Sequence, residues 1–465
     1  MIQIYNTLTR NKEEFRPIQA GEVKFYVCGP TVYDYFHIGN GRSFINADFI
    51  HRYLAYRGFK VTFIMNVTDV DDKIIKKANA EGVESSVIAA KYTQAFFEDL
   101  AKLGIKPATL HPKATEHMKE IIDIIRRLEE KEIAYNVNGD VFYDISKFNG
   151  YGKLSGKNID ELEAGSRVDV NEIKKHPLDF SLWKSAKPGE PFWESPWGKG
   201  RPGWHIECSA MGSKHLGETF DIHAGGSDLI FPHHENEIAQ SEACFGKTFA
   251  NYWIHFGFLN IDNTKMSKSL GNFFTVRDIL EKFPATALRL FFAQTHFSVQ
   301  LNFTHEALEA AAKGSEKMQN LRATLTSYIQ TAPEKGLDFS LEEYRGRFTG
   351  AMDDNFNTPN AVAVLFDFLR DVNRALDKEE KLSKKSAGDL LTFFEETAGG
   401  VLGLLSEKPV GDAGLEDEVI GLLLYVRTEL KKEKNYRLSD VIRDRLKEIG
   451  IEIRDSKEGT TFRKL

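Results

Sequence analysis

The chain has 465 residues, of which 42% are hydrophobic and 28% are charged, and its formal net charge is −7 at pH 7. This composition is typical of a globular protein, and the length predicts several domains rather than one core. Because no run of about 18 apolar residues occurs, we expect no membrane span, and the negative charge argues against wholesale nucleic-acid binding while allowing a local basic surface.

The N-terminal stretch MIQIYNTLTRNKEEF lacks the apolar segment of a signal peptide. The three cysteines are widely spaced and give no disulfide framework, so we interpret them as thiols, metal ligands or packing residues. We therefore expect a cytoplasmic protein.

The first part of the chain, 1–110, alternates strand and helix patterns. VKFYVCG is a short apolar run closed by glycine and predicts a buried strand. Ile45, Phe49 and Tyr53 then recur at helical spacing, and Gly58 stands where a helix would end. FKVTFIMNVTD predicts a second strand. This order indicates the opening half of a doubly wound parallel sheet, in which ligands bind beyond the carboxyl ends of the strands.

From residue 111 to 200 the pattern changes. ATEHMKEIIDIIRRLEEKEIAY predicts a charged amphipathic helix, NVNGDVFYDISKF predicts a hairpin, and Pro- and Gly-rich sequence follows. We interpret 111–200 as an insertion into the sheet domain, which resumes over 201–265. There TFDIHAGGSDLIF predicts a strand and a loop, and PHHENEIAQSEACF predicts a helix with proline in its first turn.

The remainder is mainly helical by periodicity, and we divide it into 266–310, 311–407 and 408–465. Helices are predicted in HEALEAAAKGSEKMQNLRATL, TPNAVAVLFDFLRDVNRAL and SAGDLLTFFEETAGGVLGLL. The last segment ends in a charged helix and the β-like IEIRDSKEGTTFRKL. From Tyr425 onward it carries 12 Lys and Arg against 8 Asp and Glu, an excess of positive charge in an acidic chain.

The turn after the first strand contains HIGNGR, which places His37 and Asn40 at the start of the predicted helix. A helix N-terminus offers free N–H groups and a partial positive charge, which suits phosphate. The dinucleotide fingerprint and the P-loop motif are both missing. A second reading, in which His37 only caps the helix, stays open.

A second candidate phosphate-binding feature is NTKMSKSLGN, at 263–272. Lysines in a short loop can stabilise the charge that develops on a transferring phosphoryl or nucleotidyl group. A solvated basic loop is the alternative.

Four residues form a candidate metal site. His233 and Glu237 are four apart in PHHENE, hence on one helical face, whereas Cys28 follows the first strand and Cys208 lies in GWHIECSAMG. Zinc accepts thiolate, imidazole and carboxylate ligands. The set comes from separate segments, so core packing stays open for each member, and we assign Cys244 to the core.

Together these stretches resemble the class I aminoacyl-tRNA synthetases, and among them the cysteine-specific members. HIGN is similar to the HIGH signature of the family, with Asn40 at its last position, and KMSKS at 265–269 is the second signature, unaltered. CGPTVYDYFHIGN, GWHIECSAM, DIHAGGSDLIFPHHENEIAQ and DDNFNTP extend the resemblance over nearly the whole chain. Phe462 departs from it, because many relatives have tryptophan there.

The resemblance implies an α/β fold: a doubly wound parallel-sheet (Rossmann-like) catalytic domain at 1–110 and 201–265 with the connective insertion 111–200. A KMSKS-loop and stem-contact region (266–310), a helical bundle (311–407) and a small anticodon-binding module (408–465) would follow. The implied reaction activates L-cysteine with ATP and Mg²⁺ to cysteinyl-adenylate and transfers cysteine to the 3′ end of tRNA(Cys). No protein nucleophile is needed, and we expect a monomer.

The resemblance also implies residue roles. One Zn²⁺ would select cysteine over serine, because a thiolate is the softer ligand, and its ligands would be Cys28, Cys208, His233 and Glu237. The ATP site and its catalytic groups would be His37, Gly39, Asn40, Lys265 and Lys268. The cysteine substrate would contact Cys28, Gly29, Thr31, Thr68, Trp204, His223 and Asp228, although core packing stays open for Trp204.

Two rival functions stay open. A ligase that joins cysteine to an amino sugar would lack the C-terminal module, and a non-catalytic regulator would not need intact HIGN and KMSKS. Some members of the family also make cysteine persulfide with pyridoxal phosphate through lysines in KIIK and KMSK, which occur here at 73–76 and 265–268. We therefore carry pyridoxal phosphate as the cofactor of an expected side activity.

Overall fold

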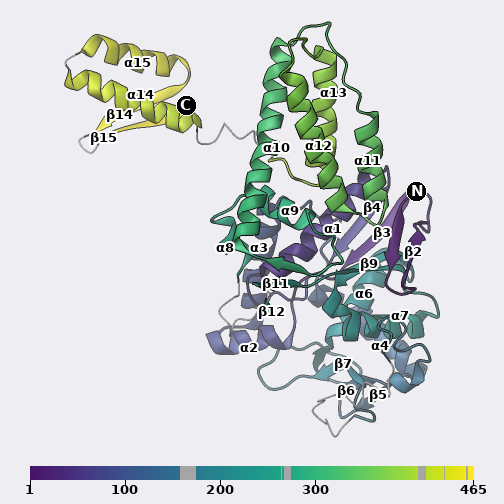
Figure 1. Cartoon of the computed structure of the whole chain (residues 1–465). Helices are drawn as coiled ribbons and strands as arrows, with labels where there is room; N and C mark the ends of the chain where they lie inside the picture. Colours follow the sequence, from purple (N-terminus) through teal and green to yellow (C-terminus); the bar gives the residue numbers. More distant parts are fainter. Residues whose placement is uncertain are drawn as a thin grey trace. The chain divides into compact units, whose positions relative to one another are not determined.

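The computed structural model of the chain describes residues 1–157, 174–262, 264–265, 274–406, 415–433, 435–456 and 459–464. It forms two compact units, Met1–Leu405 and Ser406–Leu465 (Figure 1). Each unit has a hydrophobic core of its own.

The centre of the first unit is a parallel sheet in the order β10–β9–β3–β4. Its strands are Ala250–Phe256 (β10), Phe220–Gly226 (β9), Glu22–Val27 (β3) and Lys60–Met65 (β4). The strands are rich in buried apolar residues, as expected of a parallel sheet covered on both faces. Chain order reverses between β3 and β9, so the carboxyl edge there is the topological switch point at which doubly wound sheets bind ligands. The predicted fold class is confirmed.

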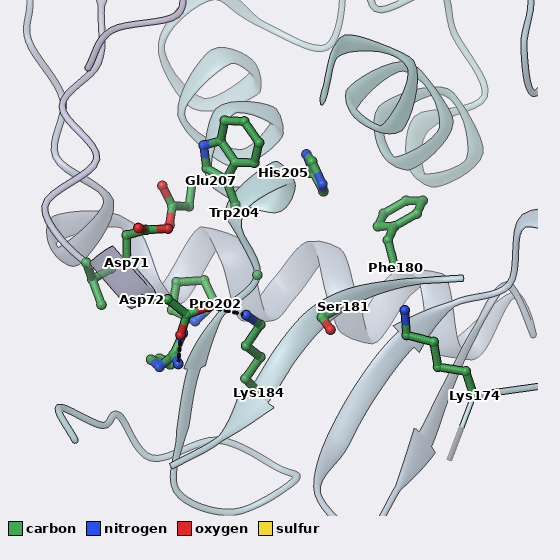
Figure 2. Close-up of a pocket in the computed structure, with 13 residues that line it drawn as sticks. Asp71, Asp72, Lys174, Phe180, Ser181, Lys184, Pro202, Trp204, His205 and Glu207 are labelled. Atoms are coloured by element: carbon green, nitrogen blue, oxygen red, sulfur yellow. Dashed lines mark hydrogen bonds and ion pairs between the residues drawn. The ribbon is translucent and has the colours of Figure 1, made fainter. Parts of the chain in front are cut away.

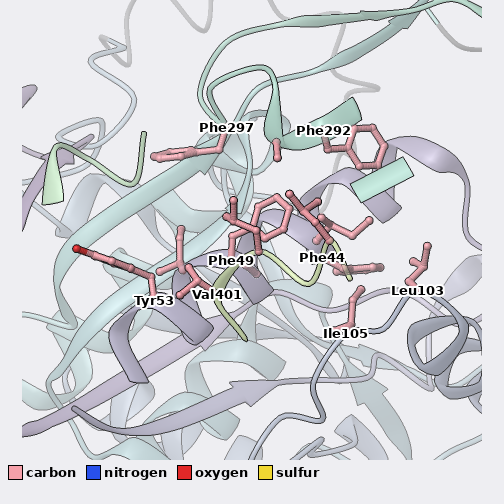
Figure 3. Close-up of a cluster of buried hydrophobic side chains, with 14 of the residues drawn as sticks. Phe44, Phe49, Tyr53, Leu103, Ile105, Phe292, Phe297 and Val401 are labelled. Atoms are coloured by element: carbon pink, nitrogen blue, oxygen red, sulfur yellow. The ribbon is translucent and has the colours of Figure 1, made fainter. Parts of the chain in front are cut away.

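Helix α1, Ile38–Tyr56, crosses from β3 to β4 and is buried along most of its length. Phe44, Phe49 and Tyr53 belong to the main hydrophobic cluster together with Phe292 and Phe297 from the region after the sheet (Figure 3). Seven consecutive residues, Phe44–Ile50, are buried, so the protein encloses this part of the helix on every side, with the polar Asn46 and Asp48 among the buried residues. The core therefore fixes α1, and with it the turn at its N-terminus.

The insertion contains a four-stranded antiparallel sheet in the order β5–β6–β7–β8. These strands are Ala134–Val137, Asp140–Tyr143, Phe180–Ser185 and Gly200–Pro202. The predicted hairpin is thus confirmed as β5–β6. Figure 1 shows this sheet and the helical bundle on opposite sides of the central sheet. The described α-helices between β4 and β10 in the sequence are α2 (Asp72–Glu81), α3 (Ser85–Lys102), α4 (Met118–Glu130), α6 (Trp204–Leu216) and α7 (Glu235–Phe245).

After the sheet come the short strands β11 (Leu259–Ile261), β12 (Thr264–Lys265) and β13 (Leu301–Phe303), and the helices α8 (Val276–Leu280) and α9 (Ala285–Ala293). The bundle follows as α10 (His305–Thr331), α11 (Glu342–Asp353), α12 (Thr358–Leu376) and α13 (Lys384–Phe394). Three of its helices were predicted. The pattern of α11 was missed because it buries few apolar residues, Phe348 and Met352 among them.

An N-terminal hairpin, β1 (Gln3–Asn6) with β2 (Asn11–Glu14), was also not predicted. Its short strands are largely polar, and β1 is held by contacts to β10 that lie far away in sequence: the Asn6 side-chain amide donates to the Asn251 carbonyl (2.9 Å). Local pattern carries no signal for such pairing.

The second unit contains α14 (Leu415–Lys432), α15 (Tyr436–Glu448) and the hairpin β14–β15 (Ile451–Ser456 and Gly459–Lys464). Ile420, Leu424, Leu446 and Ile451 make its small core. The predicted charged helix is two helices, and the predicted β-like end is the hairpin. No helix in the described part of the chain is both long and apolar enough to cross a membrane.

Candidate active site

The carboxyl edge of the central sheet gathers the residues that were predicted to bind a metal. Cys28 directly follows β3, Cys208 lies in α6 and Glu237 lies in α7. All three are buried, as is His233. One ligand atom from each of the four lies within 4.8 Å of the others, although the set spans more than 200 positions of sequence.

The donor set fits zinc. The two sulfurs are 4.0 Å apart, close to the roughly 3.8 Å expected for two thiolates on one tetrahedral zinc. Glu237 Oε1 lies 3.6 Å from Cys28 Sγ and 3.0 Å from His233 Nε2. Two sulfurs, one imidazole and one carboxylate are ligand types that zinc accepts. The second carboxylate oxygen, Oε2, lies 2.8 Å from His223 Nε2, which orients the carboxylate.

The helix predicted from Pro232 begins later. Residues Ile230–His234 form a π-helical turn in which Phe231 is non-helical, and regular α7 starts at Glu235. This turn brings His234 as well as His233 to the cluster, and His234 Nε2 lies 3.3 Å from Cys28 Sγ. A second, overlapping donor set therefore exists, Cys28, His223, His234 and Glu237. His234 was missed because helical spacing cannot distinguish two adjacent histidines.

Charges in the cluster are strongly coupled. The hydrogen bond from Cys28 lowers the pKa of the Cys208 thiol to about 6, whereas burial raises the pKa of Cys28. Burial alone would raise the pKa of Glu237, but His223 and His233 hold it at about 2. The cluster thus concentrates anionic ligand atoms in a buried place, an arrangement that a bound cation would stabilise.

The expected substrate residue Thr68 belongs to a buried hydrogen-bond chain at the ends of β3 and β4. The Gly29 N–H donates to Asn66 Oδ1 (2.8 Å), the Asn66 amide donates to Thr68 Oγ1 (3.4 Å), and the Thr68 hydroxyl donates to Glu207 Oε2 (3.0 Å). Thr31 pairs with Thr68 through a parallel β-bridge. Asn66 and Glu207 were missed, although Asn66, a polar residue directly after a buried strand, was a usable signal.

Trp204 opens α6 and is not a core residue, because 41% of it is exposed. Its ring stacks on His233 with centroids 4.2 Å apart, and His205 Nδ1 lies 2.8 Å from His233 Nδ1. The expected substrate residues His223 and Asp228 differ in setting: His223 is buried against Trp253, and Asp228 is exposed on the turn Ser227–Leu229.

A pocket of about 280 Å³ adjoins Trp204 on the side of the insertion (Figure 2). Lys184 and Arg201 from the insertion strands both form ion pairs with Asp72, and Asp71 and Glu207 also line the pocket. Lys174 is the third cation of the lining, so three cations and three carboxylates line the pocket, which offers no excess of positive charge for phosphates.

The HIGN signature lies at the start of α1. His37 is the N-cap of this helix, because its Nδ1 accepts a hydrogen bond from the Asn40 N–H at 3.2 Å. The predicted capping role is confirmed, and the His37 ring lies at the helix N-terminus. Gly39 and Asn40 are half-buried in the first turn. The Ile38 N–H donates to the Phe274 carbonyl at 3.0 Å. Phe274 lies five positions after the KMSKS signature at 265–269, and residues 266–273 lie outside the described part of the chain. The backbone of Lys265 ends β12, and Lys268 lies outside the described residues.

Comparison with known proteins agrees with this geometry. The family described as "tRNA synthetases class I (C) catalytic domain" matches residues 14–313. A cysteine–tRNA ligase of Clostridioides difficile (strain 630) is 49% identical, with all of both chains covered, and one of Thermococcus onnurineus (strain NA1) is 48% identical over all of this chain and 99% of that protein. The chain belongs to the cysteine–tRNA ligase family.

The family assignment confirms the resemblance to cysteine-specific class I synthetases. A DALR domain matches residues 347–406, within the helical bundle. Because similarity to cysteine–tRNA ligases runs through the tail, the comparisons do not support the amino-sugar rival.

Solved structures confirm the class I fold. Mycobacterium tuberculosis methionyl-tRNA synthetase in complex with methionyl-adenylate aligns with a TM-score of 0.64 at 15% identity, over 82% of this chain and 92% of that one. A ternary complex of Agrobacterium radiobacter K84 LeuRS, tRNA and LeuAMS aligns with a TM-score of 0.61 at 10% identity, over 84% and 85% of the two chains.

Proposed function

We propose that the chain activates L-cysteine with ATP and transfers it to the 3′ end of tRNA(Cys), with zinc–thiolate contact selecting cysteine over serine. The observation that supports this most directly is the buried Cys28, Cys208, His233 and Glu237 set at the switch point of the sheet. The cysteine carboxylate attacks the α-phosphate of ATP, and pyrophosphate leaves to give cysteinyl-adenylate. A ribose hydroxyl of the terminal nucleotide then takes the cysteinyl group, and AMP leaves.

Those four residues would hold zinc. When bound, zinc would supply a soft Lewis acid that prefers a thiolate to a hydroxyl, which pocket shape alone separates poorly. The chain's own contribution is orientation: His223 holds one Glu237 oxygen, and Trp204 stacks on His233. The remaining proposed cysteine contacts are Gly29, Thr31, Thr68 and Asp228.

ATP, accompanied by Mg²⁺, would bind at the N-terminus of α1, where His37, Gly39 and Asn40 lie. Helix N-termini attract phosphate. Lys265 and Lys268 would stabilise charge on the leaving pyrophosphate, an assignment supported by the hydrogen bond that brings residue 274 to Ile38.

The five-part division of the chain at 110, 200, 265, 310 and 407 is retained as a proposal, together with a monomeric, cytoplasmic enzyme and an anticodon-binding role for 408–465. We also propose a persulfide side activity with pyridoxal phosphate. Lys73 and Lys76 are exposed on α2, which would leave their amines accessible to an aldehyde.

Metal analysis combined with cysteine-dependent ATP–pyrophosphate exchange tests the function. Wild-type protein should contain one zinc per chain and exchange with cysteine but not with serine. The Cys28→Ser/Cys208→Ser variant should lose both zinc and exchange. Cys244→Ser is the matched control, because Cys244 is a buried cysteine in a different hydrophobic cluster and should retain both.

Zinc-free, active wild-type protein would overturn the metal role. Equal exchange with serine would overturn selection by zinc, and wild-type protein that exchanges with neither amino acid would overturn the proposed reaction.

A further inference from the structure

A line of hydrogen-bonded groups leads from Cys28 to the N-terminal hairpin. His234 Nε2 lies 3.3 Å from Cys28 Sγ, and its Nδ1 lies 2.8 Å from His255 Nε2. His255 Nδ1 in turn lies 2.8 Å from Thr7 Oγ1. The sulfur and both rings are buried, and Thr7 is half-buried at the end of the line. Nothing in the reaction described above uses Thr7.

The fold holds both ends of this line. The Thr7 N–H donates to the Trp253 carbonyl at 2.9 Å, which fixes Thr7 against β10 two residues from His255. At the other end Gly225 makes room for the His234 ring, because a Cβ at residue 225 would lie 2.8 Å from His234 Cε1. The backbone at Thr7 and at Gly225 therefore helps to set the distances along this line of hydrogen-bonded groups.

The chemistry of the groups fixes the direction of the hydrogen bonds. Both rings are buried and meet nitrogen to nitrogen at 2.8 Å, and no carboxylate is among their hydrogen-bond partners in the described chain. A positive charge on either ring would be desolvated and unpaired, so both rings are neutral. A neutral imidazole donates through one nitrogen and accepts at the other. A metal-bound cysteine sulfur is a thiolate and can only accept.

The direction then follows step by step from the sulfur. His234 Nε2–H donates to Cys28, so His234 Nδ1 must accept from His255 Nε2–H. His255 Nδ1 must therefore accept as well, and the group that faces it is the Thr7 hydroxyl. The end of the line requires a donor, which a hydroxyl provides and a methyl group does not.

We propose that Thr7 is a positioning residue whose hydroxyl fixes the tautomers of His255 and His234 and so directs one N–H at the metal-bound sulfur of Cys28. This inference rests on the proposed zinc site. Without the hydroxyl, His255 is free to carry its proton on Nδ1, which reverses the line and turns a lone pair of His234 toward the thiolate. Outer partners of this kind typically change metal affinity by 10–100-fold.

Thr7→Val removes the hydroxyl at nearly constant shape, and Thr7→Ser restores it. Thr9→Val is the matched control: Thr9 is an exposed threonine of the same hairpin, and its hydroxyl bonds Glu13. The readouts are zinc release to a chromophoric chelator and the thiolate-to-metal absorption band of the cobalt-substituted protein. Thr7→Ala provides a second hydroxyl-free variant, and thermal melting shows that each variant is folded.

Thr7→Val and Thr7→Ala should release zinc at least about tenfold faster than wild type and shift the cobalt band. Thr7→Ser and Thr9→Val should match wild type in both readouts. If wild-type protein holds zinc and the folded Thr7→Val variant releases it at the wild-type rate with an unchanged band, the role of Thr7 is wrong while the proposed function stands. Wild-type protein that never binds zinc would overturn both the role of Thr7 and the proposed zinc site.

Discussion

Single residues in this site are constrained by backbone as much as by chemistry, and Gly29 is the clearest case. A Cβ at this position would overlap the carbonyl oxygen of Asn66, so only glycine allows the two segments to approach so closely. The Gly29 N–H also donates to the Asn66 side chain. The Asn66 amide in turn donates to the Thr68 hydroxyl. The position of the segment after β4 therefore depends on the absence of a side chain at residue 29.

Gly29→Ala should therefore displace the Asn66–Thr68 segment and impair cysteine activation. Overpacking of this kind costs about 1–3 kcal/mol of stability. Misplacement by about 1 Å in an active site can cost on the order of 10²-fold in rate, which we expect for kcat/KM in pyrophosphate exchange. Gly346→Ala in α11 is the control, because a Cβ there meets open space and should leave exchange unchanged. Wild-type exchange by Gly29→Ala would show that the contact does not position the substrate.

Helix α1 is the element on which the proposed ATP site depends, and the buried side chain of Arg42 ties its second turn to other parts of the chain. Arg42 donates to the carbonyls of Gly257 and Phe258 (2.8 Å each), His296 (3.2 Å) and Val299 (2.5 Å). Burial lowers the pKa of Arg42 to about 10, so the guanidinium is charged at neutral pH. The N-terminal part of α1 is thereby tied to the chain segments after β10 and after α9.

Arg42→Met should destabilise the first unit by at least about 3 kcal/mol, because four carbonyls lose a hydrogen bond from a charged group and such bonds contribute about 1.5–3 kcal/mol each. Arg42→Lys keeps the charge but not the several N–H donors of the guanidinium, so its loss of stability should lie between those of wild type and Arg42→Met. Thermal melting measures both effects, with the exposed Arg16→Met as control. In exchange assays of Arg42→Lys the KM for ATP should rise more than the KM for cysteine. An equal rise in both would contradict a specific link to the nucleotide turn.

At the level of elements, the sequence predicted what local pattern controls. The buried strands β3, β4 and β9 and helices α1, α10 and α12 follow from apolar runs and spacing, and the four cysteine, histidine and glutamate residues chosen from separate segments do lie together. His234 required the π-helical turn to be seen, and Glu207 required its bond to Thr68, 139 positions away. Such contacts depend on tertiary packing and leave no periodic signal.

The whole molecule separates the proposed chemistry from the excess of positive charge. Every proposed catalytic, substrate and metal residue precedes residue 273, whereas the excess of lysine and arginine lies after Tyr425. The second unit has its own small core and exposes two aromatic side chains, Tyr425 (63%) and Tyr436 (59%). Exposed aromatic rings stack on unpaired bases, and basic residues contact the backbone of RNA.

Deletion of Ser406–Leu465 should consequently spare adenylate formation and impair charging of tRNA(Cys). The cut removes none of the first unit's core, since Leu402, Leu404 and Leu405 are retained in it. Pyrophosphate exchange should stay within about twofold of wild type, because the parts are independent. Charging at subsaturating tRNA should fall by at least tenfold, and its logarithm should decline less steeply with the logarithm of salt concentration than in the full chain, since fewer phosphates are neutralised.

In the full chain, Tyr436→Phe keeps the stacking ring and should charge normally, whereas Tyr436→Ala should weaken charging without loss of exchange. Equal charging by the full and the shortened chain, with the same salt dependence, would show that the tail does not contact tRNA.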